Sequence, residues 1–125
     1  MGEMNDDCVV YWIEAAQKEL RVLARRDARR AEILRQVAKR VEENGWILSA
    51  KSALVQVLRG DECVGELRDV AGGYRLFMFW YDTPGAREIW VCRIIPKRDV
   101  VSHRRLSDIC DAVALVRKRF LEEAE

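Results

Sequence analysis

Three arginines interrupt apolar segments in the middle of the chain: Arg68, Arg75 and Arg93. A guanidinium group stays charged at physiological pH and matches the oxygens of a phosphate with paired N–H donors. On one face of a sheet, these side chains would hold an RNA phosphate and stabilise the charge that develops when a 2′-hydroxyl attacks it. The alternative is structural, with Arg68 paired to Glu66 or Asp69 and Arg75 on a solvated face.

The sequence predicts a sheet that can bring these arginines together. After Gly45, apolar runs at 55–58, 63–70, 74–81 and 87–95 end at turns that contain Gly or Pro. Runs of this length and spacing indicate an antiparallel β-meander. The run at 74–81 is apolar enough to be the central strand, because a central strand is buried on both faces.

Along the sequence, helices are expected before and after this meander. A short strand at 8–13 is expected to precede the first helix. Apolar residues repeat at helical spacing over 16–23 and 31–41, with a break at 25–30 and a stop at Asn44-Gly45. A third amphipathic helix covers about 106–120, before the acidic tail at 122–125. We therefore expect one α+β domain over residues 1–125: an N-terminal strand and helical hairpin packed on an antiparallel meander, with a C-terminal helix. The helices are expected to cover one face of the sheet.

Charge is distributed unevenly along the chain, although 22 Lys+Arg nearly balance 21 Asp+Glu. Residues 14–45 and 82–105 each carry a net charge of +3, mainly from basic runs at 25–30 and 97–105. Such runs bind phosphates or form a solvated face. We find no helix-turn-helix pattern, and the basic runs fall between predicted elements, so direct DNA binding is not expected.

The cysteines and the histidine argue against several kinds of site. Cys8, Cys63, Cys92 and Cys110 are widely separated, and the single histidine, His103, is followed by two arginines. A zinc site needs clustered ligands, and Ser-His-Asp or Cys-His catalysis would need His103 as its base. No apolar run approaches the ~20 residues of a membrane span. We expect a soluble, cytoplasmic protein without a metal or other cofactor.

Most aromatic residues fit the strand core, but two lie beside predicted turns. Tyr81 and Trp46 hold such positions and are candidates for stacking on RNA bases.

The motifs around the arginines resemble the RelE superfamily of toxins, and most closely its HigB, or phage Gp49-like, branch. The resemblance covers residues 9 to about 123, and it is carried by four motifs: Leu58-Arg59-Gly60, Gly65-Glu66-Leu67-Arg68, Tyr74-Arg75-Leu76-Phe77 and Pro96-Lys97-Arg98. It implies a RelE-like fold and the toxin half of a type II toxin–antitoxin pair. Such toxins are metal-independent endoribonucleases that cleave mRNA, typically on the ribosome, and so inhibit translation.

The resemblance also indicates candidate site residues and partners. The candidates for catalysis are Arg68, Arg75, Arg93 and Lys97, and those for RNA binding are Arg59, Arg98, Arg104, Arg105 and Tyr81. The strand histidine of this branch is Arg93 here and the glycine after it is Ile94, so the general base stays unassigned. The implied partners are a cognate antitoxin, mRNA and the ribosome, with DNA contacted only through the antitoxin. The alternative is a catalytically weak or inactive module on the same fold that binds RNA, the ribosome or a protein.

Overall fold

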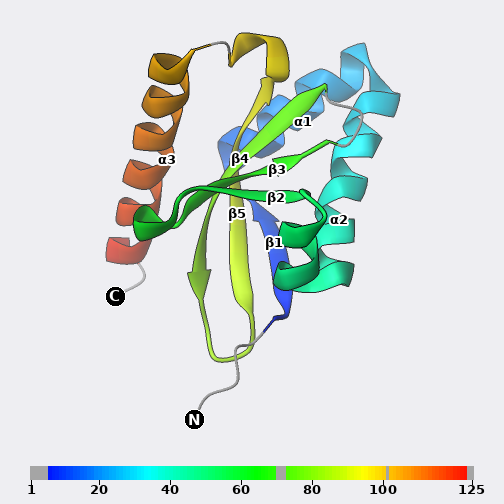
Figure 1. Ribbon diagram of the computed structural model, residues 1–125. Helices are drawn as coiled ribbons and strands as arrows, with labels where there is room; N and C mark the ends of the chain where they lie inside the picture. The colour runs from blue at the N-terminus through cyan, green and yellow to red at the C-terminus, as the bar shows by residue number, and fades with distance from the viewer. Residues whose placement is uncertain (1–5, 70–72, 101, 124–125) are drawn as a thin grey trace.

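A five-stranded mixed sheet lies between the helices of the computed structural model, which describes residues 6–69, 73–100 and 102–123 (Figure 1). The elements follow in the order β1 (Cys8–Trp12), α1 (Glu14–Arg26), α2 (Ala28–Lys51), β2 (Val55–Arg59), η1 (Gly60–Glu62), β3 (Val64–Arg68), β4 (Tyr74–Asp82), β5 (Arg87–Pro96), η2 (Lys97–Asp99) and α3 (His103–Glu123). The strand order is β1-β5-β4-β3-β2, with β1 parallel to β5 and the other pairs antiparallel. The α+β class is therefore confirmed. The last two residues of the acidic tail, 124–125, lie outside the described residues.

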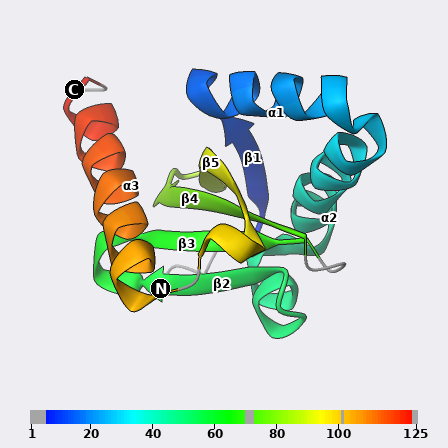
Figure 2. The same cartoon turned by 90° about the horizontal axis from the view of Figure 1, so that it is seen from above.

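The helices cover both faces of the sheet, so the expectation that they share one face is wrong. Along β4, Leu76 and Met78 face a core formed with α1 and α2, the α1–α2 core. Phe77 and Phe79 face a second core formed with α3, the α3 core. Because side chains alternate along a strand, an apolar run of this length needs cover on each side. Helix α3 lies across the sheet from α2 (Figure 2).

Helices α1 and α2 are joined by a single residue, Asp27. Its backbone N–H donates to the Leu23 carbonyl at 2.7 Å and so closes the last turn of α1. Its carboxylate accepts the backbone N–H of Arg30 at 2.9 Å, which caps the first turn of α2. The break predicted at 25–30 is therefore a sharp corner between two helices.

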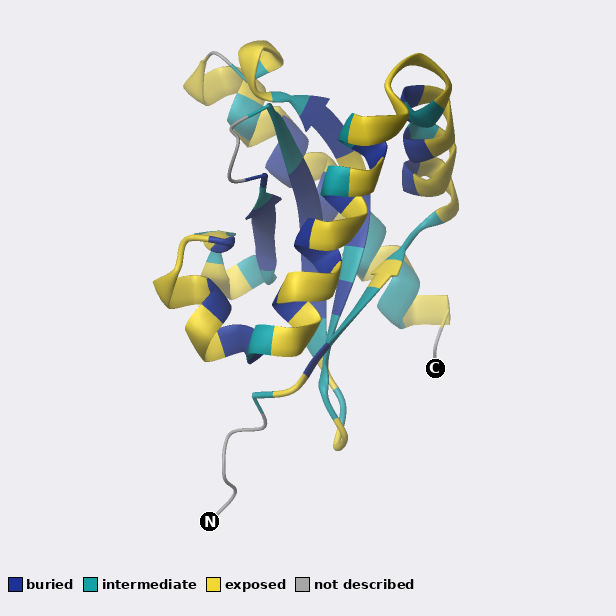
Figure 3. Cartoon of the chain, turned by 90° about the vertical axis from the view of Figure 1, so that its right-hand side faces the viewer, coloured by how far each residue is buried: buried dark blue, intermediate teal, exposed yellow. Residues whose placement is uncertain are grey.

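Gly45 interrupts α2, as the sequence indicates, but the helix resumes beyond it. Gly45 has a φ of +80°, a conformation that favours glycine, and helical turns continue to Lys51. Asp6 supports this restart: its carbonyl accepts the Trp46 N–H at 2.9 Å and its carboxylate accepts the Ile47 N–H at 2.6 Å. Buried and exposed positions alternate along α2 with the turns of the helix (Figure 3).

We find no helix that is both long and apolar enough to cross a bilayer in the described part of the chain.

Candidate functional site

Arg68 and Arg75 are held by one buried carboxylate, that of Glu66. Arg68 Nε donates to Glu66 Oε1 at 2.9 Å, and Arg75 donates to the same oxygen. Arg68 and Arg75 are direct partners in the β3–β4 register. All three side chains share the face of the α3 core, because they alternate in phase with Val64 and Phe77 of that core. The sheet thus brings two of the three predicted arginines together.

This cluster is accessible through its arginines and closed at its carboxylate. The Glu66 side chain is 3% exposed, whereas those of Arg68 and Arg75 are 36% and 21% exposed. A buried carboxylate is costly unless it is paired, and here two guanidinium groups pair with it. Glu66 therefore orients the arginines, while their exposed parts can meet a phosphate from solvent.

Arg93 does not join the pair, which corrects the prediction that three arginines share one face. Its Nε lies 3.3 Å from Glu19 Oε1 on α1, the helix of the opposite core. The cause is a β-bulge, at which the β4–β5 register shifts between Phe77 and Met78. Glu19 also accepts the backbone N–H of Ile94 at 3.3 Å, so α1 anchors the bulge.

Arg59 ties the end of β2 to α3. Its guanidinium contacts Asp111 at 2.5 Å, Glu62 at 3.2 Å and the Ser107 hydroxyl at 2.8 Å. Several of its donors are thus engaged within the protein. This geometry favours a structural role over the RNA contact expected from the sequence.

The segment from Lys97 to Arg105 lies at the same end of the sheet as Arg75. Tyr74, the first residue of β4, pairs with Pro96, so η2 begins beside the start of β4. Lys97 and Arg98 are exposed on η2, and Arg104 and Arg105 are exposed on the first turn of α3, which Ser102 caps. His103 is exposed on the same turn.

The basic run at 25–30 reaches this end of the sheet as well. A hollow of about 600 Å³ is lined by Arg30 from the start of α2 and by Lys97 and Arg98 from η2. Arg30 is fixed there by an ion pair of 2.9 Å with the buried Asp69. We call this region the basic end; it comprises Arg30, Arg68, Arg75, Lys97, Arg98, Arg104 and Arg105, and it is the upper end of the sheet in Figure 1.

Neither aromatic candidate belongs to the basic end. Tyr81 is near the far end of β4, six residues from Arg75 or about 20 Å along a strand, and its ring packs edge-on against Phe120 at 5.6 Å. Trp46 is buried and packs against Trp80 at 4.9 Å. The structure thus gives both side chains partners within the fold.

Glu66 has a more central position than its sequence context indicates, which offers it only as an alternative partner for Arg68. The position of Glu66 could have indicated its burial. Glu66 is two residues after the core residue Val64, so the two side chains lie on the same face of the strand. Within the described residues, we find no group of three or more His, Cys, Asp or Glu side chains that could hold a metal ion.

No family model matches this chain, and no curated protein matches its sequence. Among solved structures, the chain is similar to a YoeB/ParE toxin from Agrobacterium tumefaciens, with 17% sequence identity and a TM-score of 0.46. The match covers 70% of this chain and 96% of that one. A likeness at this level carries no conclusion about activity.

Proposed function

We propose that this chain is the toxin of a toxin–antitoxin pair and that it binds and cleaves mRNA without a metal. The strongest support is that two separate sequence motifs contribute side chains to one charged cluster. The motif at 65–68 supplies Glu66 and Arg68, the motif at 74–77 supplies Arg75, and these charged side chains form one cluster. Both motifs belong to the resemblance to RelE-type toxins. The cluster lies at the basic end, where both basic runs of the sequence meet.

The geometry suits a phosphodiester that is attacked by its neighbouring 2′-hydroxyl. Arg68 and Arg75 would bind the non-bridging oxygens, on which negative charge increases in the transition state. Glu66 is a positioning residue, because its burial keeps it away from the substrate while it fixes both guanidinium groups. Lys97, Arg98, Arg104 and Arg105 would bind flanking phosphates through charge alone.

A second function, RNA or ribosome binding without cleavage, is favoured by the position of Arg93. The resemblance puts a histidine at this strand position, and here an arginine that contacts Glu19 of α1 takes its place. An arginine is a poor proton acceptor because it is almost always charged. A protein of this kind would keep the phosphate contacts of the basic end and lack a general base on β5.

One experiment separates these functions. Purified protein is added to ribosomes that carry a defined mRNA, and new RNA ends and bound protein are measured in the same samples. New ends that disappear in the Arg68→Gln, Arg75→Gln double variant support cleavage by this site. Salt-sensitive binding without new ends supports the binding module, and the absence of both overturns the two proposals. Lys118→Gln, Arg119→Gln, which removes two charges at exposed positions of α3, is the matched control.

A further inference from the structure

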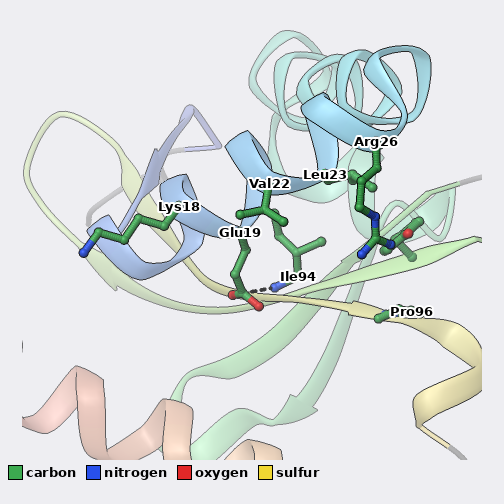
Figure 4. A pocket seen from close by; sticks show the side chains of 8 residues that line it. Lys18, Glu19, Val22, Leu23, Arg26, Ile94 and Pro96 are labelled. Atoms are coloured by element: carbon green, nitrogen blue, oxygen red, sulfur yellow. Dashed lines mark hydrogen bonds between the residues drawn. The ribbon is translucent and has the colours of Figure 1, made fainter.

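The carboxylates around Arg68 and Arg75 are poorly suited to accept the proton of an attacking 2′-hydroxyl. Glu66 and Asp69 are buried, and each pairs with arginine. Glu19 belongs to the opposite face of the sheet, where it accepts the backbone N–H of Ile94 (Figure 4). A carboxylate is also a weak base at neutral pH, because its ordinary pKa is about 4. The cleavage proposed above therefore needs a proton acceptor of another kind.

His103 lies on the side of α3 that faces the sheet. Leu106 and Cys110 of this helix pack in the α3 core. His103 precedes them by three and seven residues, and side chains at this spacing share one face of a helix. Ser102 fixes the first turn, because its hydroxyl accepts the backbone N–H of Arg105 at 3.1 Å. The imidazole therefore extends from the sheet-facing side of α3, about one turn before the core begins.

The first turn of α3 is at the same end of the sheet as the two arginines. Phe120, near the other end of α3, packs against Tyr81 near the far end of β4. Helix α3 and strand β4 thus run in the same direction, and the start of α3 follows η2 at the basic end (Figure 1).

Glu66, which holds Arg68 and Arg75, is close enough to Cys110 for its charge to act on that thiol. Burial raises the pKa of Cys110, and the Glu66 carboxylate contributes a further increase. From Cys110, α3 extends back over seven residues, or about 10 Å, to His103. From Glu66, β3 extends over two residues, or about 7 Å, to Arg68. Both displacements lead toward the basic end on the same face of the sheet.

The His103 side chain is open to a substrate. It is exposed, and a hollow of about 260 Å³ lies beside it, between Val100 and Leu106. Within the described residues, no hydrogen bond or ion pair engages the imidazole. Either of its nitrogens is therefore available to accept a proton.

We propose that His103 is the general base of the cleavage, an inference that rests on the proposed function. The ordinary pKa of histidine, about 6.5, suits proton transfer at neutral pH. An imidazole nitrogen accepts the proton of the 2′-hydroxyl while the 2′-oxygen forms a bond to phosphorus. Arg68 and Arg75 bind the non-bridging oxygens. The bond from phosphorus to the 5′-oxygen breaks, and that oxygen takes a proton from water. The products are a 2′,3′-cyclic phosphate and a 5′-hydroxyl end.

The test measures cleavage of ribosome-bound mRNA by His103→Ala, with and without imidazole in the solution. We expect the rate to decrease about 10²-fold or more. Imidazole should restore part of it, because the free base can occupy the space of the deleted side chain. It should not restore Arg75→Gln, which lacks a charge and not a base. Lys118→Ala, at an exposed position near the other end of α3, is the control and should keep the wild-type rate in both conditions.

Each result separates this assignment from the proposed function. If the wild type produces no new ends, both fail. If the wild type cleaves and His103→Ala cleaves equally fast, or if imidazole restores nothing, only the assignment of His103 is wrong. RNA affinity should stay close to that of the wild type in His103→Ala, and a loss of affinity as large as the loss of rate would make His103 a binding residue instead. An mRNA with one 2′-deoxynucleotide at the cleaved position should bind and remain intact; its cleavage would show that no 2′-hydroxyl proton is transferred.

Discussion

Arg68 and Arg75 are opposite each other on neighbouring strands and donate to the same oxygen of Glu66. Two positive charges at this separation repel each other, and the buried carboxylate between them offsets that repulsion. The pair is therefore held in place before any ligand arrives. A phosphate that reaches the exposed parts of both guanidinium groups would find its donors already oriented.

Replacing the shared carboxylate should destabilise the fold. In Glu66→Gln the two arginines lose their common counter-charge and keep only hydrogen bonds to a neutral amide, and a hydrogen bond to a charged group typically contributes about 1.5 to 3 kcal/mol. We expect a decrease of that order in the free energy of unfolding, measured by urea denaturation. Glu32→Gln, which removes an exposed carboxylate on α2, should leave it nearly unchanged. Equal effects of the two variants would contradict the central role of Glu66.

Replacing Arg75 should impair cleavage more than folding. Arg75→Gln removes the charge but keeps a donor toward Glu66, and loss of one transition-state donor typically lowers the rate by about 10²-fold to 10³-fold. We expect a decrease of this size in the rate of mRNA cleavage on ribosomes, with partial recovery in Arg75→Lys. Thermal denaturation of the same variants controls for unfolding. An unchanged rate in Arg75→Gln would remove this residue from the site.

The salt dependence of RNA binding should identify the basic end. Each phosphate contact with a single strand adds about 0.7 to the slope of log K against log salt concentration. The Lys97→Ala, Arg98→Ala variant should therefore lower the magnitude of that slope by about 1.4, measured by fluorescence anisotropy with labelled RNA. The Lys118→Ala, Arg119→Ala variant removes equal charge near the other end of α3 and should leave the slope unchanged. Equal decreases in both variants would indicate binding without a preferred surface.

Two buried thiols should make the protein less stable in alkaline solution. Burial raises the pKa of Cys92 to about 12 and that of Cys8 to about 11, from an ordinary value of 9.0. Above pH 9 the unfolded chain loses these protons while the folded chain keeps them, so the unfolding free energy decreases as the pH rises toward 11. The slope approaches about 1.4 kcal/mol per pH unit for each thiol.

The matched variant for this effect is Cys92→Ala. Its unfolding free energy should decrease less steeply than that of the wild type between pH 9 and pH 11, when both are measured by chemical denaturation. Identical slopes would show that Cys92 does not remain protonated in the folded protein over this range.

The strands and helices could be predicted because their apolar patterns are regular. The strand around 74–81, the two helices before the meander and the helix after it all appear close to their expected positions. The placement of helices on both faces could have been inferred as well. Residues 76–80 are apolar at consecutive positions, which a sheet with one solvated face would not require.

The site was less predictable because its geometry depends on register. A bulge has no clear mark in a single sequence, and this one places Arg93 beside α1 although its spacing suggests a partner for Arg75. The partners of Arg59 on α3 are about 50 residues away in sequence, so local pattern gave no sign of them. The arginines of the two motifs could be predicted to be neighbours, because β3 ends at Arg68 and β4 begins at Tyr74, a short distance along the sequence.

The one-residue connection at Asp27 has a consequence for any molecule that binds at the corner between α1 and α2. Asp27 bonds to the helix before it and to the helix after it, and both helices share one core. The two helices therefore have little freedom to change the angle between them. A rigid corner of this kind has its shape before any partner arrives, so a partner that binds there must already fit it.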